Sequence, residues 1–430
     1  MPSRLQFLWR RYRETLWLRP LGFCTAAMLA ALSASWIGAH VPAVPGLEID
    51  PDTVEKLLSI IASSMLGVAT FAVASMVSAY ASAGGTATPR VFPLVIADDA
   101  SKTALSSFVA AFIYSVIALV AIKTGYYTPS GRLILFLMTV GILAWVLLSF
   151  IRWTDNIARL GRLGTVIDRV EAAARDALER RRAAPHLGGK PADPGAKPVG
   201  RPVAAVRIGY VQHIDVGGLQ RCAEAHDLRF TVSALPGTFM TPGRALGYAV
   251  AGGEVEPGDP GDDVDAELGA AFTIGDDRVF EEDPRFGLIA LSEIAARALS
   301  PAVNDPGTAI DIIGTAVRLL AGFVAPGTQE DGDIEFDRVF VPALGMDDLF
   351  DDAFTAIARD GAGTIEVMVR LQKALTALHG LDHRAMADAA CRHSRLALAR
   401  AEAKLALPDE IEVLRGLALA ARAASVPAGD

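Results

Sequence analysis

The sequence predicts a transmembrane domain of four α-helices, followed by an α+β cytoplasmic domain with a small, barrel-like β-rich module and a helical C-terminal part. Of the 430 residues, 52% are hydrophobic, which is high for a wholly soluble chain. Four long uncharged runs fall within residues 1–153. The charge is also divided, because residues 1–182 carry 18 Lys and Arg against 12 Asp and Glu, whereas the remainder carries 22 against 37.

The four apolar runs define the predicted spans. A helix needs about 20 uncharged residues to cross roughly 30 Å of hydrocarbon, and a charge at the bilayer centre costs about 3 kcal/mol. The spans are expected at about 21–38, 57–83, 103–122 and 133–151. A cleaved signal peptide is the alternative for the first run, because Arg10, Arg11 and Arg13 precede a short apolar stretch. Cleavage would place the two chain ends on opposite sides of the membrane, which the loop charges oppose.

The loop charges predict that both termini are cytoplasmic. Lys and Arg concentrate on the cytoplasmic side of membrane proteins, and arginines crowd both the N-terminal tail and the segment after the fourth span. The loop from His40 to Thr53 carries only acidic charges and is expected outside. The short turn from Lys123 to Arg132 is then external despite its two basic ends.

Small and hydroxyl-bearing side chains distinguish the second span. At near-helical spacing they are Gly67, Thr70, Ala74, Ser78 and Ser82, with Thr86 at the exit. Such residues let helices approach closely and bond across the contact, and they could also line a polar path. Helix packing is the preferred interpretation, because no span has a charge near its midpoint of the kind that transporters use. A small-residue face also predicts a homo-oligomer.

The remainder divides into four predicted segments. Residues 154–182 are expected to form an amphipathic stalk helix and residues 183–202 a flexible, Pro- and Gly-rich linker. Alternating β-branched residues predict a β-rich module at 203–280, and helical periodicity predicts a helical module at 281–430. Within the β-rich module a Pro-Gly turn predicts a hairpin over Gly237–Val250, which resembles the half-repeat of barrel-sandwich hybrid domains such as lipoyl carriers but lacks their lysine. The acidic stretch 252–265 is expected to be an exposed loop.

Signatures of common enzymes are absent from the sequence. It has no GxSxG, no P-loop, no GxGxxG after a strand and no HExxH, so neither catalytic residues nor a cofactor is expected. Cys24, Cys222 and Cys391 lie far apart without CxxC spacing, which argues against a disulfide framework and a thiolate metal site. His379 and His383 have zinc-like spacing but lack an evident third ligand, so a capping or solvated role is preferred. The acidic C-terminal half argues against nucleic-acid binding.

The most specific polar motif is ALSPAVNDPGTA at residues 298–309. Asp305 is placed to cap a helix whose first residue is Pro306, where the missing N–H does no harm. Backbone N–H groups at such a helix start could instead hold an anion, with Arg297 one helix away. A capped turn between two core helices is the preferred interpretation. The candidate ligand or structural positions are Arg297, Ser300, Asn304, Asp305 and Thr308.

These residues resemble a family of bacterial predicted membrane proteins of unknown function that carry an ALSPAxNDPxTA signature. The segment Asp283-Pro284-x-Phe286-Gly287-Leu288, the residues Gly209–Gln212 with Asp215, and the Gly237–Val250 hairpin agree with that family in order. The exit of the second span, at 82–90, departs from the more polar run of the relatives, and the linker is enlarged. The resemblance implies a multi-pass protein of the bacterial inner membrane and supplies no reaction.

Two functional hypotheses remain from the sequence. The first is an oligomeric channel or transporter-like protein with a cytoplasmic gating or assembly domain, and it is preferred because four short-looped spans exceed what an anchor requires. The second is a membrane-anchored scaffold or sensor whose cytoplasmic domain binds a partner or a small ligand. Both involve the lipid bilayer and a homo-oligomer, and neither requires a metal or a cofactor.

Overall fold

The computed structural model describes residues 18–40, 49–96, 98–193, 199–251, 262–325 and 334–419. The arginines of the N-terminal tail, most of the 252–265 stretch and the last eleven residues lie outside this part of the chain. The described residues form two compact units, one up to Val166 and one from Ile167 onward. We call them the four-helix unit and the α+β unit.

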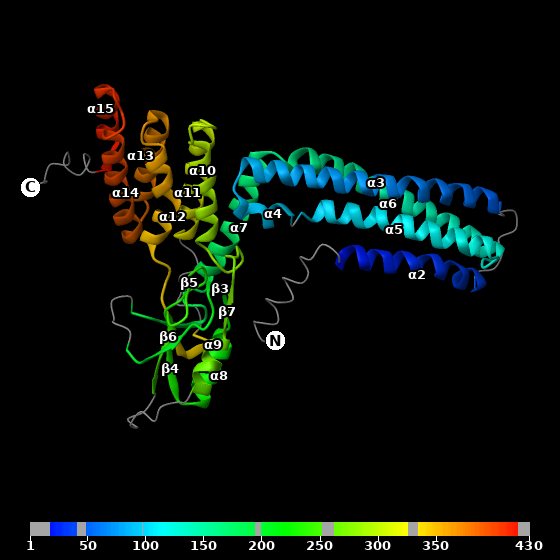
Figure 1. The fold of residues 1–430 in the computed structure, drawn as a ribbon, viewed down its shortest axis with the longest axis horizontal. Helices are drawn as coiled ribbons and strands as arrows, with labels where there is room; N and C mark the ends of the chain where they lie inside the picture. Colours follow the sequence, from blue (N-terminus) through cyan, green and yellow to red (C-terminus); the bar gives the residue numbers. More distant parts are fainter. Residues whose placement is uncertain are drawn as a thin grey trace, which may run out of the picture. The chain divides into compact units, whose positions relative to one another are not determined.

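Four long helices build the first unit (Figure 1): α2 (Leu18–His40), α3 (Pro51–Thr86), α5 (Asp99–Lys123) and α6 (Pro129–Leu160). The short helices η1 (Pro89–Val91) and α4 (Phe92–Ile96) lie between α3 and α5. The four long helices have the length and hydropathy to cross a membrane, which confirms the predicted apolar helices. Local signals set the starts of α3, α5 and α6, because the side chains of Asp50, Asp98 and Thr128 accept bonds from backbone N–H groups in the first turns.

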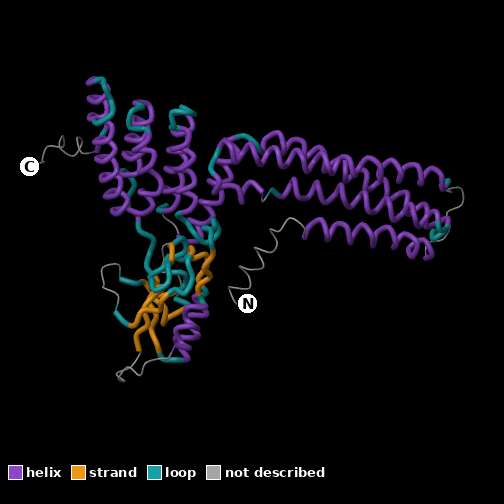
Figure 2. The backbone as a smooth tube through the Cα atoms, in the orientation of Figure 1, coloured by secondary structure: helices purple, strands orange, loops and turns teal. Residues whose placement is uncertain are grey.

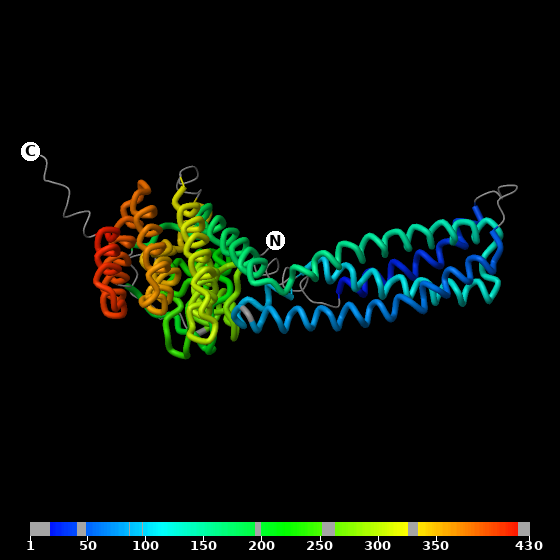
Figure 3. The backbone as a smooth tube through the Cα atoms, turned by 90° about the horizontal axis from the view of Figure 1, so that it is seen from above, coloured from blue at the N-terminus to red at the C-terminus, as the bar shows by residue number. Residues whose placement is uncertain are grey.

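Helix α5 is the centre of the four-helix unit. It packs against α2, α3 and α6, and Figure 3 shows the long helices running alongside one another. The backbones of α2 and α6 approach closely, because a Cβ added at Gly38 would lie 2.4 Å from the Cα of Gly131. Tyr127 ties the same region together by donating its hydroxyl to the carbonyl of Ala31 at 2.7 Å. Small residues and buried hydroxyls therefore join the helices, as expected in a lipid environment.

The α+β unit combines a group of helices with two sheets, which Figure 2 shows as purple and orange regions. Its helices are α7 (Leu163–Ala183, which starts just before the unit boundary), α8 (Val216–Ala225), α9 (Asp262–Ala270), α10 (Phe286–Ala298), α11 (Pro306–Phe323), α12 (Met346–Asp360), α13 (Ile365–His379), α14 (Arg384–Glu402) and α15 (Pro408–Leu417). Helices α10 to α15 pack on one another, whereas α8 and α9 pack on the strands.

The strands form two open sheets rather than the barrel-like module that the sequence predicted. The strands are β1 (Gly189–Pro191), β2 (Arg201–Ala204), β3 (Gly209–Ile214), β4 (Leu228–Val232), β5 (Phe239–Met240), β6 (Ala245–Ala251), β7 (Phe272–Gly275) and β8 (Phe336–Val341). One sheet has the order β1-β8-β4-β6-β2 and the other the order β5-β3-β7. Strand β8 runs parallel to both β1 and β4. Phe230, Leu219, Met240 and Val339 are fully buried in the core between these elements.

Several predicted segment boundaries were wrong. The expected linker at 183–202 contains β1 and the start of β2, and β8 comes from the expected helical module. β1 and β2 have only three and four residues, so their stability depends on pairing with distant segments. The predicted hairpin over Gly237–Val250 was also wrong: β5 pairs with β3 and β6 with β2 and β4, so its two arms belong to different sheets.

The expected stalk at 154–182 is not one continuous helix. Helix α6 ends at Leu160 with Gly161 as its C-cap residue, and α7 starts at Leu163. From Ile167 onward α7 belongs to the α+β unit. There Glu171 pairs with Arg318 of α11 at 2.6 Å. Residues that the amphipathic pattern assigned to a stalk therefore pack into the helical group.

Polar side chains are buried between helices α12, α13 and α14. His393 is 2% exposed and contacts the rings of Phe350 and Phe354. Burial, together with Arg392, lowers the pKa of His393 to about 4, although the Asp351 carboxylate 3.1 Å away opposes this shift. A neutral imidazole is therefore the folded form near pH 7.

A second buried polar group connects the C-terminal helices. Gln372 donates to the carbonyl of Ser394 at 3.0 Å, and the Ser394 hydroxyl donates to Gln372 Oε1 at 2.6 Å. The same hydroxyl accepts the backbone N–H of Leu419 at 3.1 Å. Because both side chains are fully buried, each bond satisfies a group that water cannot reach.

Candidate functional site

The small-residue face predicted for the second span lies on the outside of the four-helix unit. Its exposed members along α3 are Gly67, Thr70, Ala74, Ser78 and Ser82. Nothing lies within 4 Å of a Cβ added at Gly67. The Thr70 hydroxyl donates to the carbonyl of Leu66 at 2.9 Å, so its bonding is satisfied inside the helix. Thr86 ends α3, and its side chain lies outside what the structure describes.

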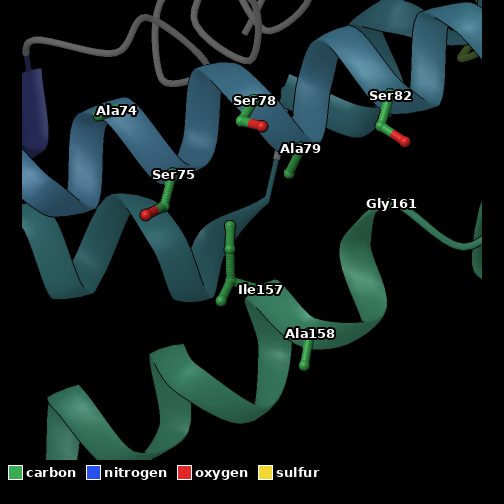
Figure 4. A pocket seen from close by; sticks show the side chains of 8 residues that line it. All are labelled: Ala74, Ser75, Ser78, Ala79, Ser82, Ile157, Ala158 and Gly161. Atoms are coloured by element: carbon green, nitrogen blue, oxygen red, sulfur yellow. The ribbon is translucent and has the colours of Figure 1, made fainter.

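A shallow groove of about 610 Å³ runs between this face and the end of α6 (Figure 4). Its lining residues are Ala74, Ser75, Ser78, Ala79 and Ser82 on α3, with Ile157, Ala158 and Gly161 opposite. Figure 4 shows Ile157 reaching from α6 toward α3. A Cβ at Gly161 would lie 3.5 Å from the Ser82 hydroxyl. The groove is therefore walled mainly by alanine, serine and glycine, with Ile157 as a large apolar side chain among them.

A buried polar cluster lies at the start of α5, where sequence reasoning did not place one. Asp98 is 7% exposed and accepts bonds from the Ser101 backbone at 2.9 Å and from Asn156 Nδ2 of α6 at 2.6 Å. One turn further on, Lys102 is 4% exposed. The third span was expected at 103–122, whereas α5 already begins at Asp99, so Lys102 lies within the helix. Asp98 as the N-cap residue of α5 could be predicted from the sequence, but its partner Asn156 on α6 could not.

The ALSPAVNDPGTA motif forms a capped turn between α10 and α11. Asn304 adopts φ = +50°, in the left-handed region, and its N–H donates to the carbonyl of Ser300 at 2.9 Å. The Asp305 carboxylate accepts bonds from the Thr308 N–H at 3.1 Å and from the Thr308 hydroxyl at 2.6 Å. These bonds lower the pKa of Asp305. The preferred interpretation of Asp305 as a cap is confirmed. Arg297 is exposed in the last turn of α10, and a ligand at this loop stays a prediction.

The neighbouring motif around Asp283 forms a buried ion pair. Asp283 is 1% exposed, and its carboxylate accepts a bond from Arg278 Nε at 2.6 Å and one from the Arg285 backbone at 3.1 Å. Burial raises the pKa of Asp283, although Arg278 opposes the shift. Gly237, with φ = +89°, passes so close that an added Cβ would lie 2.3 Å from the Asp283 carboxylate. The pair therefore anchors the loop before β5 to the start of α10.

The histidines singled out by sequence serve as local supports. His383 precedes α14, and its Nδ1 accepts the Met386 N–H at 3.2 Å, whereas His379 lies in the last turn of α13. The preferred capping role of His383 is thus confirmed. Asp215 caps α8 by accepting the Gly218 N–H at 3.1 Å. His213 lies 3.6 Å from Glu282.

A cavity of about 880 Å³ lies in the α+β unit at the N-terminus of α8. Its lining includes Arg180, Arg221, Asp215 and Glu282, with Phe336 of β8 providing an apolar wall. Arg221 lies 3.7 Å from the Asp215 carboxylate. Groups of both charges therefore face one space of a size that holds a small molecule.

Comparison with known proteins identifies the family. Residues 13–377 match the family described as predicted membrane protein (DUF2254). The chain belongs to the DUF2254 family. Uncharacterized proteins of Mycobacterium bovis and Mycobacterium tuberculosis are 25% identical to this DUF2254 chain over 312 residues. The matched part covers 69% of this chain and 58% of each relative, so the match spans little more than half of their length. No solved structure matches the chain.

Proposed function

We propose that this DUF2254 chain is a homo-oligomeric channel or transporter-like protein of the bacterial inner membrane, with its α+β unit in the cytoplasm as a gating or assembly domain. The observation that carries the proposal is the exposed small-residue face of α3. Elsewhere the four-helix unit turns large apolar side chains outward, including Leu137, Leu148 and Ile151 of α6. Large side chains suit lipid, whereas glycine, serine and threonine suit a neighbouring helix.

The packing within one chain supports a polar path between chains rather than inside a single chain. Helix α5 fills the centre of the four-helix unit with buried residues such as Phe108 and Tyr114. A polar path is therefore better placed between chains, where the α3 faces of neighbours would meet. Phe71 and Val77 are also exposed on α3 and would flank such a contact.

Cysteine cross-linking tests the arrangement. In a chain with Cys24→Ala and Cys391→Ser, oxidation of Ser78→Cys should produce covalent dimers in membranes, because the α3 faces meet. Leu148→Cys, on the outward side of α6, is the matched control and should stay monomeric. Equal cross-linking of both variants would contradict an α3 interface.

Flux through liposomes tests transport. Purified protein should release entrapped monovalent ions, and Ser78→Leu should reduce that release because it fills the small-residue face. Val140→Leu, an exposed position on α6, should leave the release unchanged. Absence of any flux under applied voltage, pH gradient and membrane stretch would remove transport while leaving the oligomer in place.

The cavity beside α8 favours a second candidate function, a membrane-anchored sensor of a small ligand. Both charged groups and an apolar wall would then recognise a compact polar molecule. A screen of small metabolites for protection of α8 from hydrogen exchange in the intact chain would find such a ligand. Arg221→Ala should abolish the protection, and protection that survives this change would point to another site.

A further inference from the structure

Three side chains of the types that can ligate a metal ion converge in the α+β unit. Cys222 and His226 come from α8 and its C-cap, and Glu267 comes from α9. One ligand atom of each residue lies within 4.8 Å of the other two. His226 Nε2 is 3.7 Å from a Glu267 carboxylate oxygen. We propose that Cys222, His226 and Glu267 bind a zinc ion that fastens α9 to α8.

The backbone holds the three ligands in place. Cys222 and His226 are four residues apart at the end of one helix, so both side chains lie on the same face. The His226 N–H donates to the Cys222 carbonyl at 3.1 Å, which fixes the last turn. Beside them Leu219 of α8 and Leu268 of α9 are fully buried in the core. The ligands therefore need little rearrangement to reach one ion.

The ligand types select zinc among the common divalent ions. Thiolate, imidazole and carboxylate are the groups that bind Zn²⁺ in proteins, usually in a tetrahedron. Mg²⁺ and Ca²⁺ prefer oxygen ligands throughout. The three protein ligands leave a fourth position for water, and it faces solvent because the side chains of His226 and Glu267 are 40% and 58% exposed.

Exposure also explains how the ion would enter. Cys222 is 1% exposed, whereas the side chains of His226 and Glu267 are accessible to solvent. Burial, followed by the Glu267 charge, raises the pKa of Cys222 to about 11, so without metal the sulfur carries a proton. Metal coordination replaces this S–H bond with a sulfur–metal bond and gives the proton to solvent, with no change of oxidation state. Without a metal ion, the exposed pair of His226 and Glu267 would contribute little to the stability of the contact between α8 and α9.

The test uses the full chain in detergent, stripped of metal with a chelator and titrated with Co²⁺ as a spectroscopic probe for the zinc site. We expect the thiolate-to-cobalt charge-transfer band and its removal by Zn²⁺. Cys222→Ser should abolish the band. Cys391→Ser, which removes an exposed cysteine on α14, is the matched control and should retain it. His226→Gln and Glu267→Gln should each weaken binding by about tenfold or more, because even outer-shell changes at metal sites cost that much.

A second measurement separates metal binding from folding. Zn²⁺ should slow hydrogen exchange in α9 of the original chain and of Cys391→Ser, but not of His226→Gln, whose altered side chain is exposed and leaves the core intact. Absence of the charge-transfer band in the original chain would overturn the proposal. A band lost in Cys222→Ser but unchanged in His226→Gln and Glu267→Gln would also overturn it, because it would indicate a single thiol without a built site.

Discussion

Gly287→Ala should loosen the contact between α7 and α10. A Cβ added at Gly287 would lie 2.4 Å from the Cβ of Ala174 and 2.9 Å from its Cα. Both atoms belong to the rigid part of a helix, so no flexible side chain can move away. The two helices would have to separate by roughly an ångström to restore a normal carbon–carbon distance of about 3.5 Å.

The expected cost follows from two opposing effects. Alanine gains up to about 1 kcal/mol over glycine inside a helix. Overpacking a core costs about 1–3 kcal/mol, and the upper end applies because Ala174 and the adjacent Phe286 are buried. The net destabilisation is therefore about 2 kcal/mol, which corresponds to about 30-fold faster opening.

Hydrogen exchange measured by mass spectrometry gives the assay, because it reports opening of individual helices in a multi-domain chain. Peptides from α7 and α10 should exchange about 30-fold faster in Gly287→Ala than in the original chain. Gly322→Ala in α11 is the control, because nothing lies within 4 Å of its added Cβ. It should leave exchange unchanged or slow it. Equal exchange in both variants would refute the inferred close contact between the two helices.

Three further predictions concern stability. Ser394→Ala should destabilise the C-terminal helices by about 1–3 kcal/mol, because it leaves Gln372 Oε1 and the Leu419 N–H buried without the bonds that the hydroxyl makes. Proteolysis that is no faster in the α14–α15 region would contradict this. The pKa of His393 is about 4 in the folded chain and about 6.5 in the unfolded chain. Above pH 6.5 this histidine therefore leaves the free energy of unfolding unchanged. As the pH falls toward 4, protonation of the unfolded chain lowers that free energy by up to about 3 kcal/mol. The urea midpoint of the original chain should therefore drop between about pH 7 and pH 5, and the drop should be smaller in His393→Phe. An equal drop in both chains would exclude this histidine as the cause. Asp305→Ala should cost about 1 kcal/mol, whereas Asp305→Asn should keep the cap and lose only the part that depends on charge. Because the pKa of Asp305 is lowered, that part is present above about pH 4 and disappears as pH falls through the folded-state value, as a denaturation series would detect.

The sequence by itself determined the features whose free energy is local. Four uncharged runs are long enough to cross a bilayer, and each became a helix. Asp305 and Pro306 predicted a helix start, because an N-cap residue bonds only to backbone groups within the next three residues. The family could also be recognised from the residues, since the ALSPAVNDPGTA motif is contiguous.

Tertiary structure alone decided the pairings between distant segments. β1 has only three residues and lies in a segment rich in proline and glycine, so its strand exists because β8, almost 150 residues later, bonds to it. The α3 face was visible as a pattern, but its exposure required the positions of α5 and α6. Cys222 and Glu267 met only after α8 and α9 packed together. Contacts of this kind are set by the burial and hydrogen bonding of the whole chain, which no local pattern encodes.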